Sequence, residues 1–155
     1  METLRLTDIE ANARSGNYPP LTFTTGASER MRIDSSGRVG IGGTPNTNWR
    51  NDIADQEVLM LGTEATLYSD SVTTQLLNNA FLNNSDTFLN ISTRGASQYY
   101  QYQGAHKWFT AASASAGSSI NTEMTTPKMT LDINGKLLVG KTATGAGNVG
   151  SEMRA

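Results

Sequence analysis

The chain has 155 residues, a formal net charge of −2 at pH 7 and no cysteine. This balance argues against a basic surface for nucleic acid or anionic membrane, and the missing thiols exclude disulfides, thiolate metal sites and a cysteine nucleophile. No stretch approaches the ~20 apolar residues of a spanning helix. We therefore expect neither membrane insertion nor nucleic-acid binding.

The composition predicts an all-β chain. Ser, Thr, Asn and Gly supply about 40% of the residues, whereas hydrophobic residues supply only 37%. Turn formers recur along the whole length with short apolar runs between them, which is typical of many short strands. A small domain buries proportionately little of its surface. We expect several copies of the chain to share the burial that one copy lacks.

Residues 1–20 form a first segment. Glu2 stands where a secretory signal would be basic, and no apolar stretch comes after it, so no targeting segment is expected. "LTDIEANAR" is compatible with a single helix turn, and "METLRLTD" with a short strand. The run "SGNYPP" then ends any regular element.

A β-hairpin is predicted in residues 21–45, where the strand "LTFTTG" is followed by "ERMRIDSSGRVGIG". Apolar and polar residues alternate on both sides of the turn, which is the period of a strand. Asp34 and Gly37 frame the turn, because Asp hydrogen-bonds the backbone ahead of it and Gly accepts a positive φ. The apolar face of this hairpin consists of Met31, Ile33, Val39 and Ile41.

The same pattern returns within residues 127–142, as "PKMTLDINGKLLVG". Its turn contains Asn134-Gly135, a strong short-range hairpin signal. Its apolar face consists of Met129, Leu131, Leu137 and Val139. Because a lone hairpin is marginally stable in water, each copy must bury its apolar face against something else.

The two hairpins bracket a central β-rich block, residues 58–126. Strands are predicted there at "VLML", "ATLYS", "TTQLLNNAFLN", "DTFLNIST", "QYYQYQ" and "HKWFTAAS", with Gly104 in a hairpin turn. "SASAGSSINTEMTTP" is interpreted as a small polar connection. Residues 46–57 are polar and are interpreted as a linker, and residues 143–155 as a flexible C-terminal segment.

Motifs for catalysis or cofactor binding are weak. "GKLLVGKT" satisfies the phosphate-loop pattern, but its Leu-Leu-Val favours a strand, and the "TATGAGNVG" after Lys141 cannot form the required helix. His106 is the only histidine and is interpreted as a surface strand residue. "NNSD" at 83–86 lacks the glycine and terminal Glu of a calcium loop. We expect no catalytic residue, no cofactor, no metal and no enzymatic activity.

Aromatic residues cluster in one short stretch of the central block: Tyr99, Tyr100, Tyr102, Trp108 and Phe109. On facing strands such residues form cross-strand core pairs. Aromatics interleaved with Gln are also typical of surfaces that contact sugars or proteins. The first interpretation is favoured, and Tyr100, Tyr102 and Trp108 are kept as candidate receptor contacts under the second.

These stretches carry a resemblance to a known family. "FTTGASERMRIDSSGRVGIGGTP" resembles a segment that recurs in bacteriophage tail fibre and related virion fibre proteins, typically "T-x-G-x-E-R-M-R-I-x-x-x-G-x-V-G-I-G-T-x-x-P". Residues 43–45 are a shortened version of its ending. "ASQYYQYQGAHKWFTAAS" and "KMTLDINGKLLVGKT" also resemble the more C-terminal parts of such fibres, so that the likeness covers roughly residues 21–145.

The resemblance implies an elongated, β-rich, intertwined homotrimer on the virion, most directly in the phage tail. Residues 1–20 would then dock on other virion proteins, and the central block would project as a spacer or adhesin toward a host glycan or protein. The eight apolar hairpin residues would form the trimer core. A head fibre or capsid decoration protein is the alternative, and a glycan-cleaving tailspike is a third hypothesis.

Overall fold

The computed structural model describes residues 19–50 and 56–140, and the backbone of the strand at 151–153. In this part of the chain the elements are β1 (Leu21–Thr25), β2 (Ser28–Ile33), β3 (Val39–Ile41), β4 (Glu57–Leu61), β5 (Ala65–Ser69), β6 (Thr73–Asn78), β7 (Ala80–Leu82), β8 (Phe88–Asn90), β9 (Ala96–Tyr102), β10 (Ala105–Ala111), α1 (Asn121–Thr125), β11 (Met129–Leu131), β12 (Leu137–Val139) and β13 (Ser151–Met153). The all-β prediction is confirmed. The predicted N-terminal segment lies outside the described residues except for 19–20, and the predicted tail except for 151–153.

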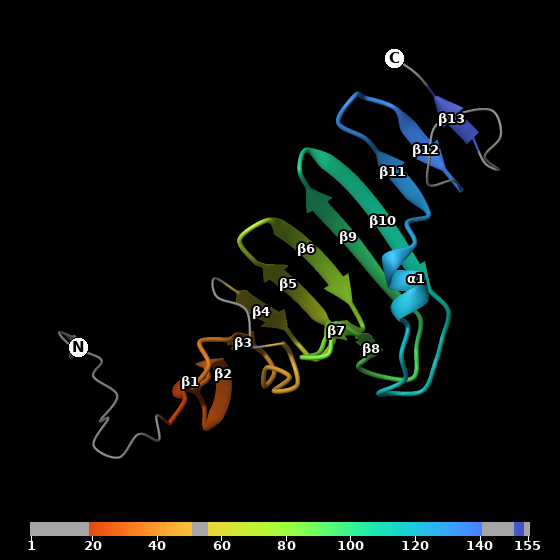
Figure 1. Ribbon diagram of the computed structural model, residues 1–155. Helices are drawn as coiled ribbons and strands as arrows, with labels where there is room; N and C mark the ends of the chain where they lie inside the picture. The colour runs from red at the N-terminus through yellow and green to blue at the C-terminus, as the bar shows by residue number, and fades with distance from the viewer. Residues whose placement is uncertain (1–18, 51–55, 141–150, 154–155) are drawn as a thin grey trace.

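Eleven strands form one sheet whose spatial order follows the chain, β1-β2-β3-β4-β5-β6-β9-β10-β11-β12-β13. All pairs between neighbours are antiparallel except β3 with β4, which are parallel. Figure 1 shows the strands stepping from the N-terminal to the C-terminal hairpin, with β7 and β8 set apart as a second small sheet. The three predicted strand modules thus share one continuous sheet.

The two repeated sequences form the same hairpin. In β2–β3, Met31 pairs with Ile41, and in β11–β12, Met129 pairs with Val139. The carboxylate of Asp34 accepts hydrogen bonds from the backbone N–H of Ser36 and Arg38, at 2.9 and 3.0 Å. Asp132 makes the same two bonds in the second copy, each 2.9 Å long. The turn chemistry predicted from Asp-x-x-Gly is therefore confirmed in both copies.

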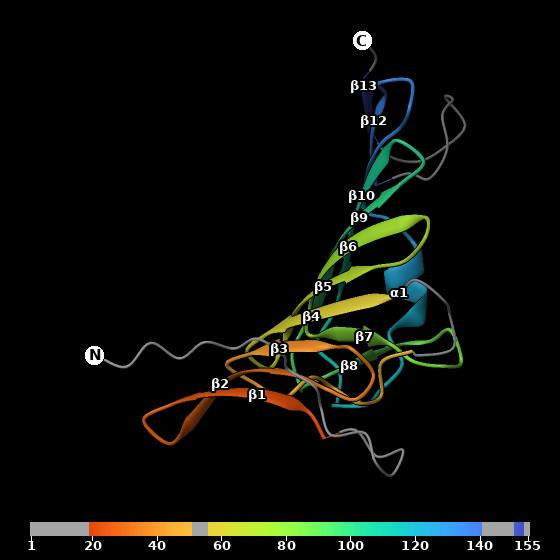
Figure 2. The same ribbon diagram turned by 90° about the vertical axis from the view of Figure 1, so that its left-hand side faces the viewer.

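One face of the sheet is packed against the rest of the chain. Figure 2 shows α1, β7 and β8 all on the same side of the large sheet. Trp49 lies on this side and is 1% exposed, with its ring stacked on that of Tyr68 at a centroid distance of 5.4 Å. Phe81 of β7 and Met124 of α1 complete the same buried cluster. We call this side of the sheet the covered face.

Three local expectations about this core need correction. The segment 46–57 contains the buried Trp49, so its described part, 46–50 with 56–57, contributes to the core rather than serving only as a polar linker. The "SASAGSSINTEMTTP" stretch contains α1, because Ile120 and Met124, four residues apart, both bury their side chains. "TTQLLNNAFLN" is two strands, since Asn79 between β6 and β7 has a φ of 55°.

The first hairpin differs from its twin at the middle residue of its second strand. Gly40 stands where the second copy has Leu138, because residues after β3 fold back beneath the hairpin: a Cβ on Gly40 would lie 2.3 Å from the carbonyl oxygen of Gly43 and 2.6 Å from Cδ of Pro45. Gly43 is itself in close approach to the β4–β5 turn. The next described strand, β4, pairs in parallel with β3.

Replacing Gly43 by Ala is expected to destabilise the fold by about 2 kcal/mol. The added Cβ would lie 2.3 Å from the carbonyl oxygen of Gly62, which is backbone and must move. Thermal unfolding followed by circular dichroism should show a melting temperature lower by roughly 5 °C. The exposed neighbour Thr44, replaced by Ala, is the control. Equal melting of the two variants would contradict the close approach.

Candidate assembly face

The second face of the large sheet carries an unbroken row of apolar and aromatic side chains. Residues paired across neighbouring strands project to the same side of a sheet. Following these pairs from β1 to β12 gives one row: Leu21, Ile33, Val39, Leu59, Leu67, Leu76, Tyr99, Trp108, Met129 and Val139. We call this side of the sheet the open face.

Further apolar side chains flank the row on the open face. At the N-terminal end they are Phe23, Met31, Ile41 and Leu61, and at the C-terminal end Leu131 and Leu137. Among the described residues, eight large hydrophobic side chains are exposed, and six of them are on this face: Phe23, Ile41, Leu61, Leu67, Leu76 and Val139. The other two, Val72 and Ile133, lie outside the strands.

On the open face, strands of the sheet leave large apolar side chains exposed to solvent. In β6 the residues alternate strictly between buried and exposed, and the exposed set includes Leu76, which is 54% accessible. Soluble monomers rarely expose large contiguous apolar patches, and those that do use them to bind another molecule. An apolar row of this length is therefore a candidate surface for contact with another molecule.

All eight residues predicted from the repeated hairpins lie on this face. Met31, Ile33, Val39 and Ile41 form one end of it, and Met129, Leu131, Leu137 and Val139 form the other. The structure brings both groups onto one surface. That they form a trimer core stays a prediction, because the structure contains a single chain.

The middle of the open face was not identified from the sequence. Leu59 and Leu61 alternate with the buried Val58 and Met60 in "VLML". Four consecutive apolar residues in a strand are typical of a strand covered on both faces. That signal was present in the sequence and would have predicted an apolar side chain on each face of β4.

The three candidate receptor contacts do not share a surface. Trp108 belongs to the open-face row, where its ring lies 5.3 Å from that of Tyr99. Tyr100 and Tyr102 project to the covered face, on which their rings lie 6.1 Å apart. His106 is on the open face next to Tyr99, whose hydroxyl contacts its Nδ1. Of the three candidates, only Tyr100 and Tyr102 lie on one face and can contact the same ligand.

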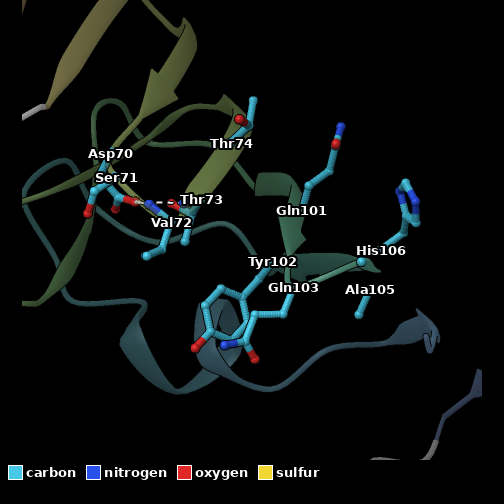
Figure 3. Close-up of a pocket in the computed structure, with 11 residues that line it drawn as sticks. Asp70, Ser71, Val72, Thr73, Thr74, Gln101, Tyr102, Gln103, Ala105 and His106 are labelled. Atoms are coloured by element: carbon cyan, nitrogen blue, oxygen red, sulfur yellow. Dashed lines mark hydrogen bonds between the residues drawn. The ribbon is translucent and has the colours of Figure 1, made fainter.

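A polar pocket of about 330 Å³ lies where the β5–β6 turn meets the β9–β10 turn. Figure 3 shows Asp70 to Thr74 on one side of it and Gln101 to His106 on the other. The Asp70 carboxylate accepts hydrogen bonds from the backbone N–H groups of Val72 and Thr73, at 3.0 and 2.7 Å. The Asp70 carboxylate therefore mainly stabilises the β5–β6 turn in which it lies.

The pKa of Asp70 is lowered. Partial burial alone would raise this pKa, but hydrogen bonds from the backbone of Val72 and Thr73 and from the hydroxyls of Thr73 and Tyr68 together outweigh it. A carboxyl group whose pKa falls on folding stabilises the protein above its unfolded pKa. That contribution is lost as the pH falls through the folded pKa.

Replacing Asp70 by Asn is therefore expected to remove part of the acid sensitivity of the fold. The variant should lose less stability than the parent as the pH drops below 3.8, the ordinary value for Asp70. Melting temperatures measured between about pH 7 and pH 2.5 would show the two curves converging in acid. Parallel curves over this range would contradict the assignment.

The comparisons with known proteins add no identification. No family model, no curated protein and no solved structure matches the chain. Within the described residues, no group of three or more His, Cys, Asp or Glu side chains could hold a metal ion. No helix of that part of the chain is long and apolar enough to cross a membrane.

Proposed function

We propose that this chain is the subunit of a homotrimeric virion fibre, a phage tail fibre or fibre segment that serves as spacer and adhesin in host attachment. The observation that carries the proposal is the open face, an apolar row that crosses the sheet from β1 to β12 and is left uncovered by its own chain. Three such sheets, packed through these faces around one axis, would share a continuous apolar interior.

The distribution of the apolar residues supports an axial assembly along the whole sheet. The twin hairpins place equivalent sets of side chains near its two ends. Leu59, Leu67 and Leu76 continue the same row between them. At ~25 cal/mol per Å² of buried apolar area, burial of ~100 Å² at one strand would contribute ~2.5 kcal/mol per chain to the free energy of assembly. Each further strand of the row would add a similar contribution.

We propose three chains, rather than another number, because residues 23–45 resemble segments of virion fibre proteins. A two-sheet sandwich is the competing arrangement, because two apolar sheet faces can also pack directly on each other. The two assemblies differ in mass and in symmetry. The mass of the particle in solution therefore decides between them.

Light scattering coupled to gel filtration tests the assembly. Three chains of 16.6 kDa give an expected mass of about 50 kDa. A monodisperse species of one or two chains would overturn the trimer. Antibody raised against the chain and applied to phage particles that encode it should label the tail, and labelling of the head alone would favour a head fibre.

A further inference from the structure

A second cavity lies on the covered face, away from the open face. It has a volume of about 370 Å³ and lies, open to solvent on one side, between the middle strands of the large sheet and the layer formed by β7, β8 and α1. Its lining includes Tyr100 and Phe109 from the sheet and Phe88 and Met124 from the opposite layer. This volume lies within the range of small-molecule sites, which are typically aromatic with a few polar groups.

The aromatic part of the cavity is held in place by its neighbours. The ring of Tyr100 meets Phe109 edge to face, with centroids 6.1 Å apart and planes at 87°. Nζ of Lys107 lies 5.8 Å from the centre of the Tyr100 ring. Burial, with the charge of Asp70 and the proximity of Tyr102, raises the pKa of Tyr100. Its hydroxyl therefore stays protonated and can both donate and accept a hydrogen bond.

The polar part of the cavity offers both donors and acceptors. Thr73, Gln75 and Gln98 form a hydrogen-bonded ladder across β6 and β9, with lengths of 3.1 and 2.6 Å. The ladder leaves Oε1 of Gln98 without a partner among the described residues. On the opposite side, Oδ1 of Asn121 accepts from the N–H of Phe88 at 3.2 Å, which leaves its amide N–H₂ without a hydrogen bond in the described part of the chain.

The charges around the cavity are close to balanced. Asp86 is paired with Arg50, so its charge is compensated outside the lining. Lys107 and Asp70 contribute one charge of each sign. A lining that is neutral overall, and that both donates and accepts, favours a neutral polyhydroxylated ligand over an ion. The C–H groups on one face of a sugar ring carry partial positive charge and suit the negative face of an aromatic ring.

We propose that this cavity binds a neutral pyranose unit of a surface saccharide, with the sugar ring against Tyr100 and its hydroxyl groups on Lys107 and Asn121. The proposal rests on the adhesin role given above and names the class of ligand for it. The cavity is built within one chain, so each subunit of an assembly would carry its own site. These sites are on the side of the sheet opposite to the assembly face.

Saturation-transfer NMR on the intact protein tests the site, with methyl glycosides of glucose, galactose and mannose and with N-acetylglucosamine as probes. At least one probe should receive saturation, and Tyr100→Ala should weaken its binding about tenfold. Tyr100→Phe keeps the ring and should retain most of the affinity. Lys107→Met should weaken binding, while Lys128→Met, at an exposed lysine outside the cavity, should not.

Each outcome decides one question. Every variant is first shown to have the mass and the β-sheet circular dichroism of the parent at the temperature of the binding experiment, so that a loss of binding cannot reflect unfolding. If the parent binds none of the probes, or if Tyr100→Ala binds as well as the parent, the saccharide site is wrong while the fibre assembly is untouched. If the parent is a single chain but binds a probe in a Tyr100-dependent way, the fibre proposal fails and the site stands.

Discussion

Replacing Leu76 by Asp is expected to convert the proposed trimer into single chains. Leu76 lies in the middle of the open-face row, between Leu67 and Tyr99. A carboxylate buried there without a cationic partner would cost about 3 kcal/mol or more in each chain. Three chains carry the change, and about 9 kcal/mol corresponds to more than a millionfold in the dissociation constant.

The same substitution should leave the fold of one chain intact. The Leu76 side chain is 54% exposed in the isolated chain, so an Asp at this position remains largely in water until the sheets pack. The measured mass should fall from about 50 kDa to the 16.6 kDa of one chain, with the β-sheet circular dichroism retained. A lower mass with the β-sheet signal retained distinguishes loss of assembly from unfolding of the subunit.

Ile133→Asp is the matched control for this experiment. Ile133 is even more exposed, at 73%, but it lies in the β11–β12 turn rather than on a strand of the open face. Its variant should assemble like the parent. If Leu76→Asp also remains trimeric, the open face is not the interface, and the apolar row needs another explanation.

The repeated hairpins were predictable because each carries its information locally. Asp34 and Asp132 fix their turns through hydrogen bonds to residues two and four positions ahead. Alternation over three residues on each side then sets which side chains share a face. Nothing distant in the chain is needed to interpret either pattern.

The extent of the open face could not be predicted in the same way. It depends on the order in which strands pair, and β6 pairs with β9 across the β7–β8 excursion. A local pattern can indicate that Leu76 and Tyr99 each occupy a strand. Only the pairing shows that the two side chains are neighbours in one row that joins both hairpins.

Trp49 and α1, which together with β7 and β8 form the covering layer on the covered face, were missed for a different reason. Trp49 is a single apolar residue in the polar stretch "NTNWRND", so it contributes no periodicity. The helix α1 has five residues, too few for a helical pattern to stand out, although Ile120 and Met124 have the spacing of one turn. The side chain of Trp49 and the short helix α1 are held by burial against the sheet, and no local sequence pattern predicts either of them.

Asn79 connects the covering layer to the large sheet. It is fully buried and lies between β6 and β7, where the chain leaves one sheet for the other. Its side-chain N–H₂ donates to the carbonyl oxygens of Ser92 and Arg94, at 3.1 and 3.0 Å. Its Oδ1 accepts from the N–H of Ser92 at 2.7 Å. One amide thus ties the β6–β7 corner to the loop that leads into β9.

Replacing Asn79 by Ala is expected to destabilise the fold by about 4 kcal/mol. The change removes these hydrogen bonds and leaves the partly buried N–H of Ser92 without its acceptor. It also places a Cβ-bearing residue without a local hydrogen bond at a φ of 55°, which costs about 1 kcal/mol. The melting temperature, measured at a fixed protein concentration, should fall by roughly 10 °C.

Two further variants separate the contributions at this corner. Asn79→Gly loses the same hydrogen bonds but tolerates the positive φ, so it should melt a few degrees above Asn79→Ala. Asn48→Ala, at an exposed asparagine, should change the melting temperature little. If Asn79→Ala melted like Asn48→Ala, the buried amide would not hold the two sheets together. The shape of the cavity between them would then depend on the packing of Phe81, Phe88 and Met124.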